Sequence, residues 1–214
     1  MRCLLFALLL AMLATACSLP DAAVGPQAAP RSDLVPVLAN DESAALVTVR
    51  EHVWMRTYAV EAKGGVPGIR AQLDRHGPYS SAAKRRFDAL TTWALHWTFR
   101  YDRSGGGCAL AGATVELEAI VTLPELTATE TLAPDVFNLW QAYRQQLQSH
   151  EDGHVNIYRA AARELRDEFL ATPAMGSCEE LRAALGARGE AKLAAIRAAD
   201  RAYDADTGHG CSFP

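Results

Sequence analysis

The sequence has few cysteines, no extended basic segment and a modest share of charged residues, and each shortage excludes a class of protein. Five cysteines among 214 residues are too few for a small disulfide scaffold. A net charge of −4 without a basic block argues against a nucleic-acid partner. Because 50% of the residues are hydrophobic and 21% are charged, an intrinsically disordered chain is also excluded. The length fits one domain that can bury its own core, so a metal site would serve function rather than folding.

An apolar run is present at the N-terminus, where residues 4–13 follow a single basic residue. This pattern is typical of a secretory signal peptide and is too short for a stable membrane span. Small residues at positions 14–16 precede Cys17, as in a bacterial lipobox. We therefore predict a signal peptide over residues 1–16 and a lipidated Cys17 that anchors the protein to a membrane of the bacterial cell envelope. Ser18 in the next position favours the outer membrane, facing the periplasm. Ordinary cleavage and release into the periplasm is the alternative.

The next segment, residues 17–40, is rich in proline and alanine, includes Gly25 and has no helical or strand period. We interpret it as a flexible tether to a single domain over residues 41–214. That domain holds Cys108, Cys178 and Cys211, and an oxidising compartment predicts one disulfide and one free cysteine among them. Cys108 follows a glycine triplet and Cys178 lies near a predicted helix start, which favours a Cys108–Cys178 bridge. The other two pairings remain open.

Alternating apolar residues predict strands in the first half of the domain. Residues 45–60 alternate but change phase, which indicates a strand pair or one long strand with a bulge. A short amphipathic helix over residues 69–76 follows. Residues 92–101 alternate strictly, and residues 114–123 repeat the pattern until Pro124 ends it. The last two segments are typical of an antiparallel hairpin.

After residue 134 the apolar period changes to that of a helix. A long helical face runs over residues 136–169, and a second helix is predicted over residues 177–200. Ser177 followed three residues later by Glu180 indicates a capping box at the start of the second helix. Strands first and long helices last predict an α+β fold, in which a small antiparallel sheet from the N-terminal half packs on long C-terminal helices.

The long helix contains His150-Glu151-Asp152-Gly153-His154, the H-E-x-x-H pattern. Residues four apart share one face of a helix, so both imidazoles can bind one ion. Zn²⁺ held there would lower the pKa of water from about 15.7 towards about 7, with Glu151 as the proton acceptor. Two solvated histidines are the simpler interpretation, but the helical pattern on both sides favours a zinc site. Gly153 costs about 1 kcal/mol relative to alanine, which a close approach of ligand or backbone would explain.

A catalytic zinc site requires a third protein ligand. His209 lies between two glycines in the C-terminal tail, and such a flexible turn can bring an imidazole into a crowded site. Asp200 and Asp204 are alternative ligands, or partners that orient a ligating histidine. Glu179 and Glu180 lie at about the distance that another zinc-protease pattern requires, but beyond a proline and a glycine.

The motif and the C-terminal tail together carry a family resemblance. The domain resembles the bacterial family called domain of unknown function 922, which is described as predicted secreted zinc-dependent proteases. The resemblance extends from about residue 45 to residue 210 and rests on His150-Glu151-x-Gly153-His154, Trp140, Tyr143, Cys178 and Ala202-Tyr203-Asp204-x-x-Thr207-Gly208-His209-Gly210. It implies a zinc hydrolase fold and supports a functional His209, without identifying a substrate. Independently of the family, Tyr203 and Arg201 are candidates to stabilise an oxyanion if the tail folds over the zinc.

Two functions follow. The first is a zinc-dependent metallopeptidase, a hydrolase of the cell envelope, in which His150, His154 and His209 bind Zn²⁺ and Glu151 is the general base. Its expected substrate is a protein or peptide. The second is a non-catalytic lipoprotein with a structural zinc site or a partner-binding role, in which Cys211 supplies a fourth ligand. Three protein ligands indicate an enzyme and four indicate a structural site. Histidine and carboxylate ligands in an oxidising compartment favour zinc.

Overall fold

The computed structural model describes residues 46–210 and 213–214. The predicted signal peptide (1–16), the lipidated Cys17, the tether (17–40) and Cys211 lie outside the described residues. Within the described ranges, no helix has the length and apolar character needed to cross a membrane. The elements in chain order are β1 (Val47–Glu61), α1 (Gly65–His76), β2 (Tyr79–Ser80), β3 (Arg85–Arg86), β4 (Leu90–Asp102), β5 (Ala109–Thr127), η1 (Thr129–Thr131), α2 (Pro134–Leu170), α3 (Cys178–Thr207) and η2 (Gly208–Gly210).

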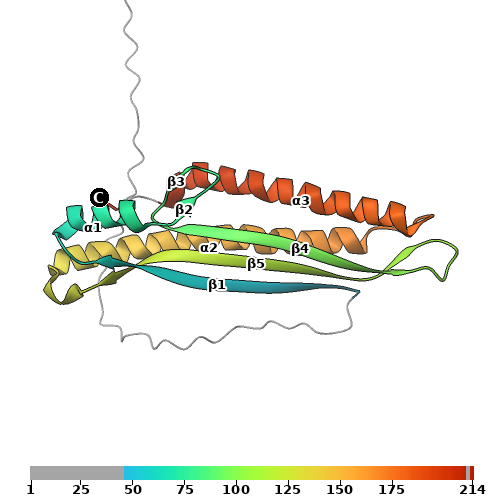
Figure 1. The fold of residues 1–214 in the computed structure, drawn as a ribbon, viewed down its shortest axis with the longest axis horizontal. Helices are drawn as coiled ribbons and strands as arrows, with labels where there is room; N and C mark the ends of the chain where they lie inside the picture. The colour runs from blue at the N-terminus through green and yellow to red at the C-terminus, as the bar shows by residue number, and fades with distance from the viewer. Residues whose placement is uncertain (1–45, 211–212) are drawn as a thin grey trace, which may run out of the picture. The chain divides into compact units, whose positions relative to one another are not determined.

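The main sheet has three strands in the order β1-β5-β4 (Figure 1). β4 and β5 form the expected antiparallel hairpin, whereas β1 pairs with β5 in parallel. The expectation of a wholly antiparallel sheet is therefore wrong for β1. The reason is topological. β4 runs opposite to β1, and the chain then turns again, so β5 has the direction of β1. β5 lies between β1 and β4 and pairs with both.

β1 and β5 are both longer and more continuous than their patterns suggest. β1 is one strand in unbroken register with β5, without a bulge. Its change of phase arises because Val60, near its end, packs in a second cluster with Ile69 and Leu73 of α1. β5 continues through Pro124, so the expected end there is wrong. Pro124 lies beyond Thr122, the last β5 residue paired with β4, and a strand with a neighbour on one side tolerates proline.

The main core lies between the sheet and the two long helices. Alternate side chains of the central strand, Val115, Leu117 and Ala119, are fully buried. α2 packs on β5 and β1, and α3 packs along α2 and reaches β4, as Figure 1 shows. These contacts confirm the α+β class with a small sheet and long C-terminal helices. α3 does not stop at Asp200 as expected but continues to Thr207.

The first turn of α3 is tied to the β4–β5 hairpin. A disulfide joins Cys108 to Cys178, the pairing that the sequence favours. Cys108 also exchanges two backbone hydrogen bonds with Met175, at 2.8 and 2.9 Å. The predicted capping box is present, since Ser177 and Glu180 bond to each other's backbone N–H groups. This end of α3 is therefore firmly placed, and its far end meets the middle of α2.

A polar network holds the segment just before β4. The Asp88 carboxylate accepts hydrogen bonds from the guanidinium of Arg70 and, at 2.5 Å, from the hydroxyl of Tyr143. The Tyr58 hydroxyl donates to the backbone carbonyl of Asp88 at 2.7 Å. β1, α1 and α2 thus converge on one residue. Because Asp88 lies three residues before Thr91, this network sets where β4 enters the region of the H-E-x-x-H motif.

Candidate metal centre

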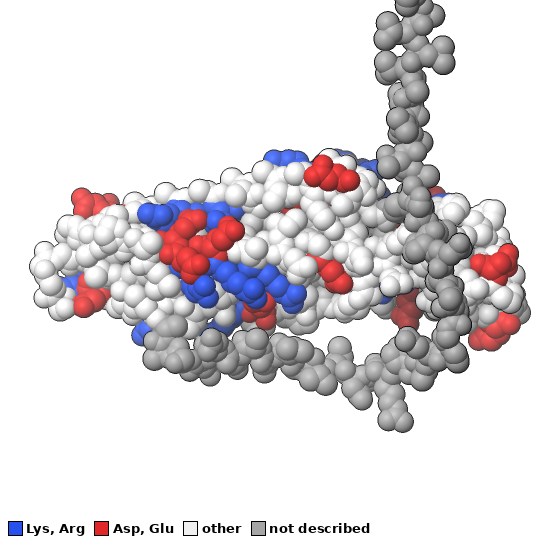
Figure 2. Space-filling model, turned by 180° about the vertical axis from the view of Figure 1, so that it is seen from behind, with Lys and Arg blue, Asp and Glu red and all other residues white. Residues whose placement is uncertain are grey.

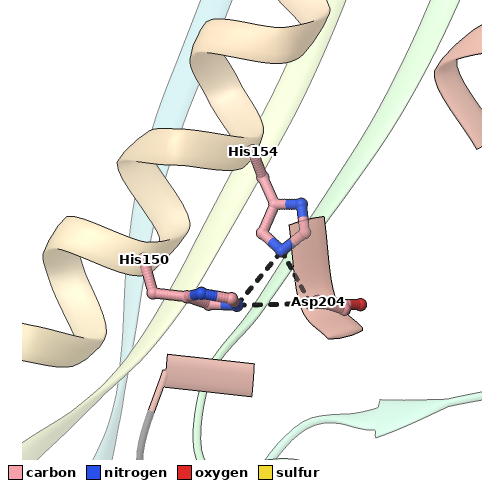
Figure 3. A group of neighbouring side chains, drawn as sticks. All are labelled: His150, His154 and Asp204. Carbon is pink, nitrogen blue, oxygen red and sulfur yellow. Dashed lines mark hydrogen bonds and ion pairs between the residues drawn. The ribbon is translucent and has the colours of Figure 1, made fainter. Parts of the chain in front are cut away.

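α2 and α3 bring three ligand atoms to one point (Figure 3). His150 and His154 lie one turn apart on α2, and both are buried. Their Nε2 atoms are 3.2 Å apart and lie 3.3 and 3.1 Å from Oδ1 of Asp204 on α3. Four tetrahedral ligands at about 2.0–2.1 Å from Zn²⁺ lie about 3.3–3.4 Å from one another. The three observed separations match that spacing.

Hydrogen bonds at the outer nitrogen of His154 fix which nitrogen faces the centre. Nδ1 of His154 lies 3.0 Å from Oδ1 of Asp200. A carboxylate accepts only, so Nδ1 of the neutral ring carries the proton and donates it. Asp200 is held in turn by the indole N–H of Trp93, at 3.1 Å. The lone pair of His154 Nε2 therefore points to the centre, and Asp200 acts as an orienting partner, one of the two roles expected for it.

The outer nitrogen of His150 also has a hydrogen-bond partner. Its Nδ1 lies 3.0 Å from Oγ1 of Thr207, and this hydroxyl donates its single proton to the carbonyl of Tyr203 at 2.6 Å. The hydroxyl must therefore accept from Nδ1–H of the neutral imidazole, which leaves Nε2 as a lone-pair acceptor. When both rings are neutral, in the tautomers that Asp200 and Thr207 favour, two imidazole lone pairs and a carboxylate oxygen converge without a proton between them. Such a group is electrostatically unfavourable until a cation binds, so the residues fit a metal ion.

Glu151 is the buried carboxyl beside this group. It is 3% exposed, and Oε2 accepts a hydrogen bond from the hydroxyl of Thr91 on β4 at 2.6 Å. Burial raises the pKa of Glu151, while the bond from Thr91 acts in the opposite direction. The hydroxyl leaves Oε1 of the carboxyl group as a second acceptor, which suits a proton-accepting role.

The pKa values of the two histidines are shifted in opposite directions. Burial lowers the pKa of His150, and the neighbouring His154 lowers it further. Burial also acts to lower the pKa of His154, but the hydrogen bond to Asp200 and the charge of Glu151 outweigh it and raise that pKa. Without metal, the neutral form of His150 is therefore favoured, whereas the carboxylate neighbours favour the protonated form of His154, which must lose a proton when a metal binds.

Tyr203 packs directly over the histidines. Its ring stacks on His150, with centroids 5.0 Å apart, and meets His154 edge-on at 5.0 Å. A Cβ added at Gly153 would lie only 2.0 Å from the Tyr203 hydroxyl. The glycine in the motif thus makes room for the tyrosine ring, rather than for a ligand or backbone. Burial, with the charges of Glu151 and Asp204, raises the pKa of Tyr203, so the hydroxyl keeps its proton and can donate.

His209, the favoured third ligand from the sequence, lies outside the group of converging ligand atoms. Its side chain is 44% exposed, and Nδ1 lies 3.4 Å from Oδ1 of Asp204. The group instead contains Asp204, which was among the alternatives. Glu179 and Glu180 are at the opposite end of α3, in its first turn. The tail still approaches the site through Gly210, where an added Cβ would come within 2.9 Å of the His150 side chain.

Two site residues are not identified by the sequence alone. Thr91 bonds to Glu151 from a strand with no local motif around it. Thr207 was visible only as part of the tail pattern, with no role assigned. Trp93, within the alternating segment 92–101, also donates a hydrogen bond to Asp200. Each of these contacts joins residues more than fifty positions apart, which no local period predicts.

A cleft of about 1340 Å³ opens beside the site. Residues of β4, of the β2–β3 hairpin, and of the facing sides of α2 and α3 line it. His150, His154, Glu151 and Asp204 all contribute to its wall. The ligand group is thus buried on the helix side and open to a space that can hold a substrate of several residues.

A model of one protein family matches most of the described domain. The family is described as "Bacterial protein of unknown function (DUF922)", and the match covers residues 55–210. No curated protein and no solved structure matches the chain. The matched range includes the H-E-x-x-H segment, Asp204 and the Gly-His-Gly tail.

Proposed function

The chain belongs to the bacterial DUF922 family, and from that premise we propose that it is a zinc-dependent metallopeptidase of the cell envelope. The observation that carries the proposal is the convergence of three acceptor atoms beside a buried carboxyl, at the wall of an open cleft. His150, His154 and Asp204 would hold Zn²⁺. Two imidazoles and one carboxylate are ligands that zinc accepts in catalytic sites.

The metal would supply a Lewis acid that polarises a carbonyl oxygen and acidifies water. Glu151 accepts a proton at Oε1 while the Thr91 hydroxyl holds Oε2. Tyr203 keeps its hydroxyl proton and presents it beside the histidines, where it can donate to the oxygen that becomes negative during peptide hydrolysis. Asp200 and Thr207 keep the two imidazoles in the tautomer that leaves Nε2 free.

The cell-envelope assignment rests on the N-terminal sequence. The apolar run over residues 4–13 and the following Cys17 support export and attachment by lipid to the outer membrane. The disulfide between Cys108 and Cys178 is compatible with that compartment, because such bonds persist where thiols are oxidised.

Replacing Glu151 by glutamine tests the catalytic role. We expect Glu151→Gln to retain one zinc per chain and to lose peptide hydrolysis by about a hundredfold or more. Asp152→Asn is the matched control, since Asp152 is the neighbouring exposed carboxylate on the same helix turn. It should keep both zinc and activity. Full activity of Glu151→Gln would contradict the proposal.

A non-catalytic metal site is the second candidate, and His209 is the observation that favours it. Its Nδ1 lies 3.4 Å from Asp204, so a small movement would make it a fourth ligand. A site with four protein ligands leaves no position for a substrate. X-ray absorption of the zinc-loaded protein decides between the two. Three nitrogen or oxygen ligands from the protein plus one exchangeable ligand support the enzyme. Loss of one nitrogen ligand in His209→Ala supports the structural site.

A further inference from the structure

The charged side chains that line the cleft differ in whether they have partners. Five arginines and five carboxylates line it. All five carboxylates already accept bonds from neighbours: Asp74 and Asp88 from Arg70, Glu151 from Thr91, Asp200 from Trp93, and Asp204 lies in the ligand group. Four of the arginines have no carboxylate partner among the described residues: Arg85, Arg86, Arg197 and Arg201. A divalent cation at the ligand group would make the cleft more positive still.

The charges of the cleft can be compared with those of the rest of the molecule. The whole chain carries a net charge of −4. On the face shown in Figure 2, basic side chains in the middle of the molecule lie next to acidic ones, and acidic side chains alone are visible towards the right-hand end. Elsewhere in the domain, Arg159 and Arg163 both pair with Glu51, and Lys192 pairs with two glutamates. Other arginines outside the cleft, such as Arg56 on β1, have no carboxylate partner among the described residues either. The cleft arginines are distinguished by their position, because they line the same cavity as the ligand group, where they can attract an anion.

Arg197 and Arg201 are placed in line with the ligand group. Arg197, Arg201 and Asp204 follow one another at intervals of four and three residues on α3, so they share one face of the helix. With a rise of about 1.5 Å per residue, Arg201 lies about 4.5 Å and Arg197 about 10.5 Å along the axis from Asp204. On the other wall, Arg85 packs over the ring of Phe87 at 4.2 Å, and Arg86 donates to the carbonyl of Gly77 at 2.6 Å.

The spacing of the two α3 arginines matches an extended peptide. They are about 6 Å apart along the helix, and side chains two residues apart on a strand are about 6.6–6.8 Å apart. β4 borders the same cleft as an outer strand of the sheet, so an extended peptide can lie between it and α3. We propose that the cleft recognises an acidic peptide, and that Arg197 and Arg201 bind two of its carboxylates, two residues apart and within about three residues of the metal centre.

This inference rests on the proposed peptidase function, because it names the substrate class of the same cleft. Guanidinium groups suit the task because they bind carboxylates in a planar, two-bond arrangement that lysine does not offer. Both side chains are exposed, so each pair is screened by salt. The arginines thus act on substrate choice and on binding, rather than on the chemical step.

Binding of dye-labelled peptides to the purified protein carrying Glu151→Gln tests the inference without turnover. The probe is a ten-residue alanine–glycine peptide with two glutamates two positions apart, compared with versions that carry glutamine or lysine instead. We expect the glutamate peptide to bind about tenfold more tightly than the glutamine peptide at about 50 mM salt, and the preference to shrink at about 500 mM. Fluorescence anisotropy measures both.

Variants locate the preference. Arg197→Gln and Arg201→Gln should each reduce the preference for the glutamate peptide about threefold, and Arg201→Lys should restore only part of it. The matched control is Arg56→Gln, because Arg56 is an exposed arginine on β1, at the opposite edge of the sheet and outside the cleft. It should leave the preference unchanged. Equal binding of the three peptides, or equal effects of Arg56→Gln and Arg201→Gln, overturns the inference.

The parent protein then separates this inference from the proposed function. If it cleaves the three peptides equally well, the peptidase function stands and acidic recognition is overturned. If Glu151→Gln protein binds the glutamate peptide selectively through Arg197 and Arg201 but the parent protein cleaves none of the three, acidic recognition is supported as binding and the peptidase function fails.

Discussion

Replacing Asp204 by alanine is expected to weaken metal binding more than any change at His209. Asp204 supplies one of the three ligand atoms and the only negative charge in the group. His209 is 44% exposed, and of the three residues in the group it contacts Asp204 alone. Residues that orient a ligand typically change metal affinity by about 10–100-fold, so we expect Asp200→Asn to fall in that range. Loss of Asp204 should exceed about 100-fold, and loss of His209 should stay below about 10-fold.

Zinc affinity can be measured by competition with a fluorescent chelator, and stability gives an independent measure. Metal at about 100 times its Kd stabilises a folded protein by about 2.7 kcal/mol. For a domain of this size that corresponds to a rise in Tm of about 5–10 °C. Asp204→Ala should lose most of this rise, and His209→Ala should keep most of it.

The matched control for Asp204 is Asp206→Ala, an exposed carboxylate in the same last turn of α3. It should behave as the parent protein in both assays. If His209→Ala weakens zinc binding as much as Asp204→Ala does, or if Asp204→Ala leaves the affinity unchanged, the assignment of ligands from the converging atoms is refuted.

Two further predictions concern stability. Gly153→Ala should destabilise the protein by about 1–3 kcal/mol in urea unfolding, because the new Cβ would lie 2.0 Å from the Tyr203 hydroxyl. This clash outweighs the helix propensity of alanine, which exceeds that of glycine by about 1 kcal/mol. Gly186→Ala is its control on α3, where an added Cβ meets nothing within 4 Å, and it should stabilise; the same sign for both changes would contradict the packing argument. Replacing Cys108 and Cys178 by alanine opens a link between residues 70 positions apart, which the chain-entropy model values at about 4 kcal/mol, so the midpoint of denaturation should fall. Zinc affinity should not change, because Asp204 lies about 39 Å further along α3 from Cys178. If zinc affinity also falls in this variant, the β4–β5 hairpin controls the site.

Local patterns predicted the main elements of secondary structure, although not all of their ends. The strict alternation over residues 92–101 predicted β4, and the change to a helical period after residue 134 predicted α2. The Ser177–Glu180 pair predicted the start of α3. These signals work because each depends on residues two to four positions apart, whose relation is set by the geometry of one strand or one helix.

The third ligand could not be identified from local patterns, because its position depends on where α3 ends. Asp200 and Asp204 are four residues apart, so a helix through both would have placed them on one face towards α2. The sequence prediction ended that helix at Asp200, which placed Asp204 in the tail together with His209, and the tail histidine was the favoured ligand. In the structure the helix continues to Thr207, and Gly208 then adopts a φ of 60°, which turns His209 away from the helical face.

By itself, the sequence determined the helix that carries His150, Glu151 and His154, because the spacing of these residues is a property of one helix. Only the tertiary structure decided which residues complete the site. The parallel pairing of β1, the bond from Thr91 to Glu151 and the position of Asp204 all depend on segments far apart in the chain. Their meeting is set by how the sheet, α2 and α3 bury their apolar faces together, and this packing leaves no periodic signal in the sequence.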